Sequence, residues 1–139
     1  MQTTQDVDPF RNDDQRHNIR WTAPEIFRGS PTTKESDIFS FGMVMIEVGG
    51  DGSVKCQSTY PLFKAFTGKV PFSGMPLTSA MSSIANGGRP GRPDHPDFAE
   101  PLWTLTQRCW SQDPQDRPDI QEVTGVLKDL SAFDSSFER

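Results

Sequence analysis

The stretch from residue 37 to residue 48 reads Asp-Ile-Phe-Ser-Phe-Gly-Met-Val-Met-Ile-Glu-Val. Large apolar side chains occupy most of its positions, so a helix built on it has no continuous polar face. A helix of this kind has to be buried on every side, and the segment therefore predicts the central helix of a domain. The preceding residues, Thr32 to Glu35, fit a capping box that begins this helix.

Shorter helices are predicted on both sides of the central one. Pro24 suits the first turn of a helix over Glu25–Arg28. Further helices are expected over 79–85 and 98–110, and Pro118 opens a last one. The apolar stripe of the last helix consists of Ile120, Val123, Leu127 and Leu130. No segment shows the alternation of a β-strand, so the predicted fold class is mainly α.

Length and composition allow one domain at most, and part of a domain equally well. Hydrophobic residues make up 33% of the 139 residues and the mean hydropathy is −0.61, which is low for a chain that must build its own core. Residues 1–18 are polar and are expected to be loop or disordered, and 132–139 are expected to form a tail.

Charge, hydropathy and cysteine spacing argue against several classes of protein. A net charge of −5 without a cluster of Lys and Arg argues against nucleic-acid binding. No apolar run is long enough for a membrane span and no secretory leader follows Met1, which predicts a cytoplasmic protein. Cys56 and Cys109 lack a Cys-x-x-Cys arrangement, so two reduced thiols are favoured over a disulfide.

Four short motifs follow one another along the chain. They are Ile19-Arg20-Trp21-Thr22-Ala23-Pro24-Glu25, Ser36-Asp37-Ile38-Phe39-Ser40-Phe41-Gly42, Thr67-Gly68-Lys69-Val70-Pro71-Phe72 and Cys109-Trp110-Ser111-Gln112-Asp113-Pro114-Gln115-Asp116-Arg117-Pro118. Together they resemble the second half of the C-lobe of a protein kinase, nearest to the tyrosine-kinase and tyrosine-kinase-like groups. The resemblance implies a partial, helical C-lobe over 19–131 without the N-lobe sheet, preceded in 1–18 by a remnant of the activation segment.

The resemblance assigns roles to individual residues. Glu25 resembles the carboxylate of the Ala-Pro-Glu motif, which in the family pairs with the arginine at the position of Arg117. Asp37 resembles the carboxylate that holds the catalytic-loop backbone, and an acid in a first helical turn also suits the helix dipole. The residues of the structural family motif are Ala23, Pro24, Glu25, Asp37, Gly42, Trp110 and Arg117.

A remnant of the peptide-substrate platform is expected just upstream. It consists of Asn18, Arg20, Trp21 and Thr22. Kinases of this group usually carry Gly-Thr where this chain has His17-Asn18, and that threonine helps to shape the platform. The substitution bears on which substrate the platform would accept.

The motifs that bind nucleotide in kinases are not found in the sequence. Phosphoryl transfer requires a Gly-rich cover, a paired lysine, a catalytic-loop Asp and an Asp that holds magnesium. The sequence has no His-Arg-Asp, its Phe41-Gly42 follows Ser40, and Gly68-Lys69 is no P-loop. No catalytic, cofactor-binding or metal-binding residue is therefore predicted. ATP and magnesium belong to the complete domain, whose nucleotide-binding parts would lie upstream of Met1.

An insertion separates the second motif from the third. Removing residues 48–64 leaves a smooth match to the family. A surface loop explains the insertion at little cost in stability, because the free energy of closing a loop rises by only about 0.6 kcal/mol per doubling of its length. A retained intron explains the insertion as well. Every Val codon begins with GT and one of the two Lys codons ends with AG, so splice signals can bound the segment from Val48 to Lys64.

Two functions from different classes remain open. The chain is a fragment of a kinase whose parent phosphorylates Ser, Thr or Tyr in proteins, or a non-catalytic kinase-lobe module that binds a protein partner. In both cases the chain alone is expected to be inactive, and its partners are proteins. Because the two downstream helices cover only part of the central helix, we also expect self-association through uncovered apolar surface.

Overall fold

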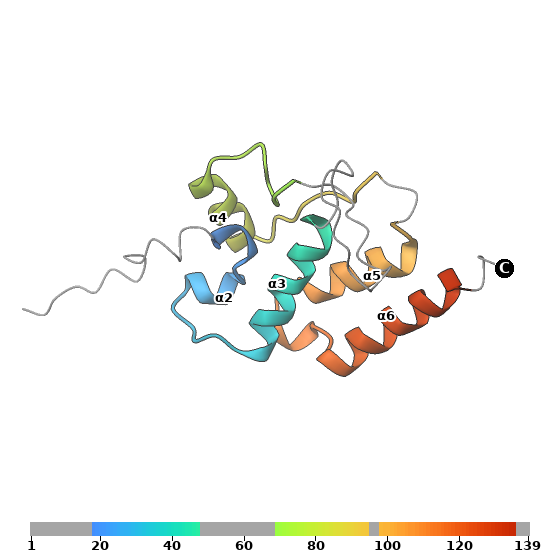
Figure 1. The fold of residues 1–139 in the computed structure, drawn as a ribbon. Helices are drawn as coiled ribbons and strands as arrows, with labels where there is room; N and C mark the ends of the chain where they lie inside the picture. The colour runs from blue at the N-terminus through green and yellow to red at the C-terminus, as the bar shows by residue number, and fades with distance from the viewer. Residues whose placement is uncertain (1–17, 48–68, 95–97, 136–139) are drawn as a thin grey trace, which may run out of the picture.

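The computed structural model describes residues 18–47, 69–94 and 98–135. In this part of the chain all regular structure is helical, which confirms the mainly α fold class. The elements follow in the order η1 Ile19–Trp21, α2 Pro24–Phe27, α3 Lys34–Glu47, α4 Leu77–Ala85, α5 Glu100–Cys109, η2 Pro114–Asp116 and α6 Ile120–Ser135. Figure 1 shows α3 crossing the middle of the molecule, with α4 on one side and α6 on the other.

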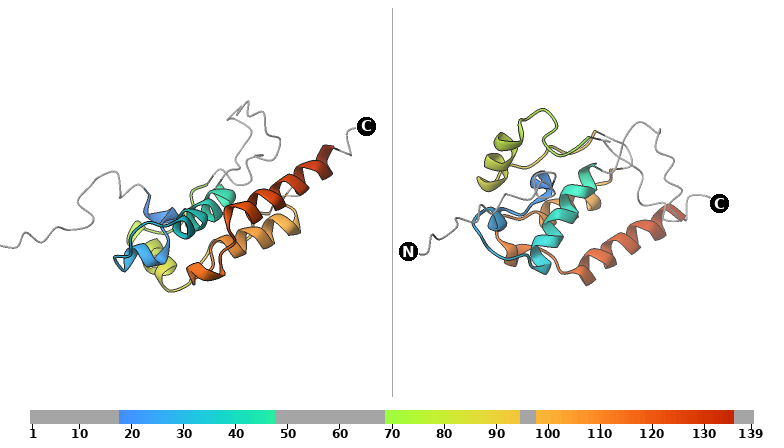
Figure 2. Two further views of the ribbon diagram at one scale, coloured as in Figure 1. Left: turned by 90° about the horizontal axis from the view of Figure 1, so that it is seen from below. Right: turned by 60° about the vertical axis from the view of Figure 1, so that its left-hand side comes forward.

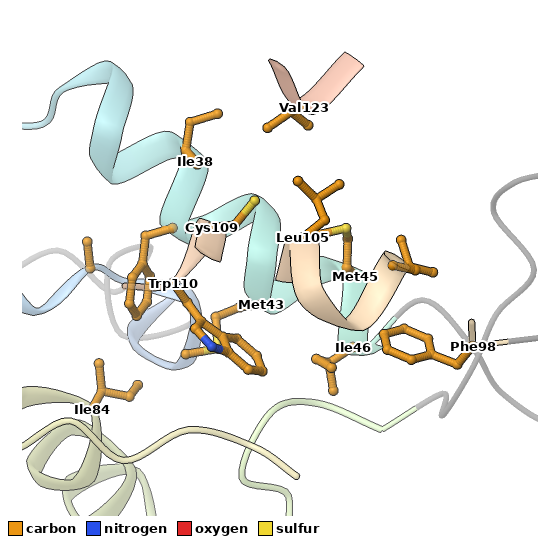
Figure 3. Close-up of a cluster of buried hydrophobic side chains, with 13 residues drawn as sticks. Ile38, Met43, Met45, Ile46, Ile84, Phe98, Leu105, Cys109, Trp110 and Val123 are labelled. Carbon is orange, nitrogen blue, oxygen red and sulfur yellow. The ribbon is translucent and has the colours of Figure 1, made fainter. Parts of the chain in front are cut away.

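Helix α3 is the central helix, as the sequence predicts. It packs on α5 over most of its length and also contacts η1 and η2. Phe39 and Met43 have no exposed surface, and the neighbouring side chains of the core are nearly as buried. In Figure 3 the side chains of α3 and α5 point toward one another, with Met45 beside Leu105.

The expectation that α3 leaves large side chains uncovered is wrong for most of them. The side chains that are buried, although they were expected to be exposed in part, are Phe39, Met43, Met45 and Ile46. Two side chains are only half-buried, Phe41 and Val44. The sequence argument counted only the helices after residue 98, whereas Ala23 and Ile84 also belong to the core cluster around α3.

The cap of α3 lies one residue later than the predicted Thr32–Glu35 box. The Ser36 backbone N–H donates to Thr33 Oγ1 at 3.2 Å, and the Thr33 N–H donates to Ser36 Oγ at 2.9 Å. This reciprocal pair has the geometry of a capping box shifted by one position. Thr32 and Thr33 could each cap the helix. The two hydrogen bonds between Thr33 and the buried Ser36 select Thr33 as the cap.

Helices α5 and α6 lie side by side, as the left view of Figure 2 shows, and α5 packs on α3. On the predicted stripe of α6, Val123 is buried and Leu127 and Leu130 are half-buried, but Ile120 is 61% exposed. Three of the four residues of the predicted stripe are therefore buried or half-buried, and Ile120 is not. Helix α6 also continues through Ser135, into the segment that the sequence predicts as a tail.

Several sequence-based predictions concern residues outside the described part of the chain. These are the loop character of 1–17, the insertion at 48–64 and the state of Cys56. Cys109 is free and buried in α5, and burial raises the pKa of its thiol to about 12. At neutral pH this thiol stays protonated and unreactive.

Candidate functional site

Glu25 and Arg117 meet although 92 positions separate them in the sequence. Arg117 Nη1 donates to Glu25 Oε1 at 2.7 Å and Nη2 donates to Oε2 at 2.9 Å, so the pair is bidentate. The Arg117 side chain is fully buried and that of Glu25 is 16% exposed. Arg117 also donates to the carbonyls of Ser111 and Glu35. The pair therefore joins α2, the start of α3 and the segment before α6.

The ion pair shifts the titration of its carboxylate. Burial alone would raise the pKa of Glu25, but the hydrogen bonds from Arg117 and from its own backbone N–H outweigh burial and hold the pKa below the ordinary value. The carboxylate is therefore ionised at neutral pH, and its negative charge is matched by a buried positive charge.

A second guanidinium, that of the half-buried Arg89, lies close to the first and was not predicted from the sequence. Arg89 lies 4.9 Å and Arg117 lies 5.1 Å from the centre of the Phe39 ring. Arg89 donates to the carbonyls of Trp110, Ile84 and Gly88 and to the side chain of Gln112. Burial, followed by repulsion from Arg117, lowers the pKa of Arg89 to about 10.

Arg20 of η1 fixes a distant loop. Its guanidinium donates to the carbonyls of Pro71, Phe72 and Met75 at 3.0, 2.6 and 2.7 Å. Phe72 has a φ of 56°, a left-handed conformation that is uncommon for a bulky side chain. Three hydrogen bonds from one arginine help to hold this turn, which leads into α4.

The other residues of the expected platform are held against α3. The Trp21 indole N–H donates to Glu47 Oε2 at 2.8 Å, and Ser40 Oγ donates to the Trp21 carbonyl at 2.8 Å. Thr22 Oγ1 donates to the Asn18 carbonyl at 2.8 Å, which closes the η1 turn. The structure thus gathers the four platform residues into one turn on the side of α3.

Four further members of the family motif are buried. Ala23 and Trp110 are 1% and 4% exposed, and Pro24 is buried at the first turn of α2. Gly42 lies where α3 crosses α5, and a Cβ added there would lie 2.9 Å from Cys109 Cβ. Small size at residue 42 therefore allows the two helices to approach closely.

Asp37 differs from the rest of the motif because its side chain is exposed. It lies in the first turn of α3 and lines two cavities, of about 610 Å³ and about 220 Å³. The smaller cavity is also lined by Asn18 and Thr22, so Asp37 and the platform border the same space. The described residues do not include a backbone segment held by this carboxylate.

Across the described ranges, no three His, Cys, Asp or Glu side chains gather so that they could hold a metal ion. None of the described helices is both long and apolar enough to cross a membrane.

Comparison with known proteins agrees with this geometry. The model of the family described as "Protein tyrosine and serine/threonine kinase" matches residues 2–127. The chain belongs to the protein kinase family. A mainly helical structure with the Glu25–Arg117 pair is what a partial kinase C-lobe would show.

Individual relatives support the same family. A probable serine/threonine-protein kinase of Dictyostelium discoideum is 33% identical over 110 residues, which are 78% of this chain and 7% of the relative. The kinase drkC of the same organism is 35% identical over 109 residues, or 78% of this chain and 12% of the relative. Mitogen-activated protein kinase kinase kinase 7 of Homo sapiens is 31% identical over 115 residues, which are 81% of this chain and 16% of the relative.

The chain spans between 7% and 16% of the length of these curated relatives. The relatives are named as kinases, and nothing in the comparison favours the alternative of a non-catalytic binding module.

Proposed function

We propose that this chain forms the substrate-side half of a kinase C-lobe, within a domain that transfers the γ-phosphate of ATP to Ser or Thr side chains of cytoplasmic proteins. The observation that carries the proposal is the buried, bidentate Glu25–Arg117 pair. It ties the end of the platform segment to the helical base, so that the platform keeps one position relative to α3.

The platform is supported from two further directions. Arg20 links it to the turn before α4, and the indole of Trp21 links it to the end of α3. A surface that must accept an extended peptide in one register benefits from such rigid support, because less freedom is lost on binding. The described residues would then position a protein substrate, while ATP and magnesium, bound elsewhere in the complete domain, supply the transferred group and its charge neutralisation.

The preference for Ser and Thr rests on the relatives. The Dictyostelium relative is named as a serine/threonine-protein kinase, and the chain resembles it over most of its own length. Asn18 stands beside Thr22 in the platform turn and is the residue most suited to alter which side chain is accepted.

Mapping the mature transcript tests the proposal. A reading frame that continues upstream into a catalytic loop and an Asp-Phe-Gly motif supports it, and a frame that holds neither contradicts it. The same transcript shows whether codons 48–64 are retained, and a message that always keeps them excludes the intron.

The protein expressed from that transcript should phosphorylate myelin basic protein when supplied with ATP and magnesium. Arg117→Met should lower its kcat/KM by at least about tenfold, a loss of about 1.4 kcal/mol in transition-state stabilisation. Arg92→Met is the matched control, because the partners of Arg92 among the described residues are the exposed Glu100 and the Phe98 carbonyl. Equal activity of the two variants would mean that the buried pair does not support the platform.

A further inference from the structure

Arg20 belongs to the expected platform, but its guanidinium is directed at another segment of the chain. Nη1 donates to the carbonyls of Pro71 and Phe72, and Nη2 donates to the carbonyl of Met75. These acceptors lie 51 to 55 positions further along the sequence. Among the described residues, the hydrogen-bond partners of this guanidinium are therefore backbone carbonyls of one turn, residues 71–75, which we call the clamped turn.

The clamped turn has a conformation that its own sequence disfavours. Phe72, with a φ of 56°, is the one residue other than glycine with a positive φ in the described part of the chain. A Cβ crowds the backbone in this left-handed region, so a bulky residue rarely adopts it. The Phe72 carbonyl accepts both from the Met75 N–H and from Arg20. Charge-assisted hydrogen bonds are stronger than neutral ones, so Arg20 stabilises a turn that Phe72 alone would not keep.

The clamped turn leads directly into α4, and α4 lies against the platform. Helix α4 packs on η1 and on α2, and Figure 1 shows it beside α2 on the opposite side of α3 from α6. Within the turn Pro71 is buried, and the half-buried Phe72 packs against the core. All these contacts join described residues, so they do not depend on any other part of a kinase domain.

We propose that the clamped turn controls the platform, so that opening of the turn releases Arg20, frees η1 from its position against α4 and weakens the binding of a protein substrate. Opening relieves the left-handed φ of Phe72, and the hydrogen bonds of Arg20 oppose opening. Two opposing terms at one turn give a closed and an open arrangement, and substrate binding favours the closed one. The role of η1 as a substrate platform rests on the proposed function, whereas the coupling of the two segments rests on the contacts above.

Hydrogen exchange in the 139-residue chain, followed by NMR, tests whether the two segments open together. The Met75 N–H closes the clamped turn, and the Thr22 N–H closes the η1 turn. Arg20→Met should speed the exchange of both amides at least about tenfold and leave the Val123 N–H of α6 unchanged, because the opening is local. Arg92→Met, which removes an arginine with partners elsewhere, should change neither. An equal rise at Val123 would assign Arg20 to global stability alone and refute the proposal.

Substitutions at Phe72 test the coupling from the side of the turn, because this residue lies outside the platform. Phe72→Val should open the turn, since a β-branched side chain tolerates a positive φ least. Phe72→Leu is the matched control, because it also removes the aromatic ring but is not branched at Cβ. The Thr22 N–H should exchange about fivefold faster with valine than with leucine. Equal exchange at Thr22 in the two variants would show that the turn opens without releasing η1, which overturns the proposal.

Glycine at residue 72 tests whether Arg20 acts against the left-handed conformation. Glycine adopts this conformation without steric cost, whereas alanine keeps the Cβ. Both replacements remove the aromatic ring, so they differ mainly in the preferred φ. Arg20→Met should therefore speed exchange of the Met75 N–H several-fold less in the Phe72→Gly background than in the Phe72→Ala background. The same acceleration in both backgrounds would contradict the role given to Arg20.

The effect on substrate binding is measured on the protein expressed from the transcript. Phe72→Val should raise the KM for myelin basic protein about fivefold relative to Phe72→Leu and leave kcat and the KM for ATP unchanged, because only the platform is affected. An active protein in which both variants have the same KM overturns the proposal. A protein without kinase activity refutes the proposed function instead, and the exchange measurements then decide whether the clamped turn and η1 open together.

Discussion

A methyl group added at Gly42 would come within 2.9 Å of Cys109 Cβ. It would also lie 3.4 Å from the Thr106 carbonyl oxygen and from the Trp110 backbone nitrogen. Two of these three atoms belong to the backbone and the third is a Cβ, so no rotation of a side chain can relieve the overlap. The distance between the two central helices is therefore set by the absence of a side chain at residue 42.

Gly42→Ala should destabilise the fold by about 1–3 kcal/mol, because relieving the overlap requires α3 and α5 to separate. Urea unfolding followed by circular dichroism measures the change in the free energy of unfolding. Gly125→Ala is the control, since a Cβ at this exposed helical position meets nothing within 4 Å. It should stabilise by about 0.5–1 kcal/mol, as expected for replacing glycine inside a helix. The same loss in both variants would contradict close packing at Gly42.

Glu25→Ala and Arg117→Ala should each destabilise the fold by about 3–5 kcal/mol, because each leaves a shielded charge without its partner. Arg117→Ala should cost more, since Arg117 also donates to the carbonyls of Ser111 and Glu35. The double variant should lose less than the sum, with a coupling of about 1–3 kcal/mol in a double-mutant cycle. Additive losses would show that the two side chains do not interact in solution.

The fold, the central helix and the Glu25–Arg117 pair could be anticipated from the sequence. A helix from Ile38 to Ile46 that is apolar at most positions is stable only when it is buried. The order of the motifs paired Glu25 with Arg117 by resemblance. The coverage of α3 could not be anticipated, because it is completed by Ala23, which precedes a helix of four residues, and by Ile84 of α4, and no pattern in the sequence assigns either residue to α3.

The hydrogen bonds of Arg20 and Arg89 could not be predicted from the sequence either. Arg20 and Arg89 act on backbone carbonyls far along the chain, and a carbonyl is present at every residue, so no motif marks the acceptor. For Arg89 the sequence offered only a Gly- and Pro-rich segment between two helices that contains two arginines, Arg89 and Arg92. The shift of the α3 cap from Thr32 to Thr33 depended on which residue Ser36 could reach.

Acid should remove the contribution of Glu25 to stability. Its folded pKa lies below the value of 4.5 for the free side chain, so the stabilisation is fully present above pH 4.5 and is lost as the pH falls through the folded pKa. The difference in unfolding free energy between the unmodified chain and Glu25→Gln should therefore be constant from pH 7 to about 5 and shrink below it. Urea titrations at several pH values measure this, and a constant difference down to pH 3 would contradict the lowered pKa.

Arg89→Met should destabilise the fold by about 1–3 kcal/mol, because it leaves the carbonyls of Trp110, Ile84 and Gly88 without this donor. Part of the loss is offset, since removing Arg89 also removes a partly desolvated charge that Arg117 repels. Arg89→Lys should recover little, because one ammonium cannot reproduce the planar set of donors.

Arg92→Met provides the comparison in the same segment. Arg92 forms an exposed ion pair with Glu100, which contributes only about 0–1 kcal/mol. Urea unfolding of the three variants should therefore rank Arg92→Met closest to the unmodified chain and Arg89→Met furthest from it. If Arg89→Met were as stable as Arg92→Met, the half-buried guanidinium of Arg89 would only fill space beside Phe39, and its hydrogen bonds would contribute nothing net to the fold.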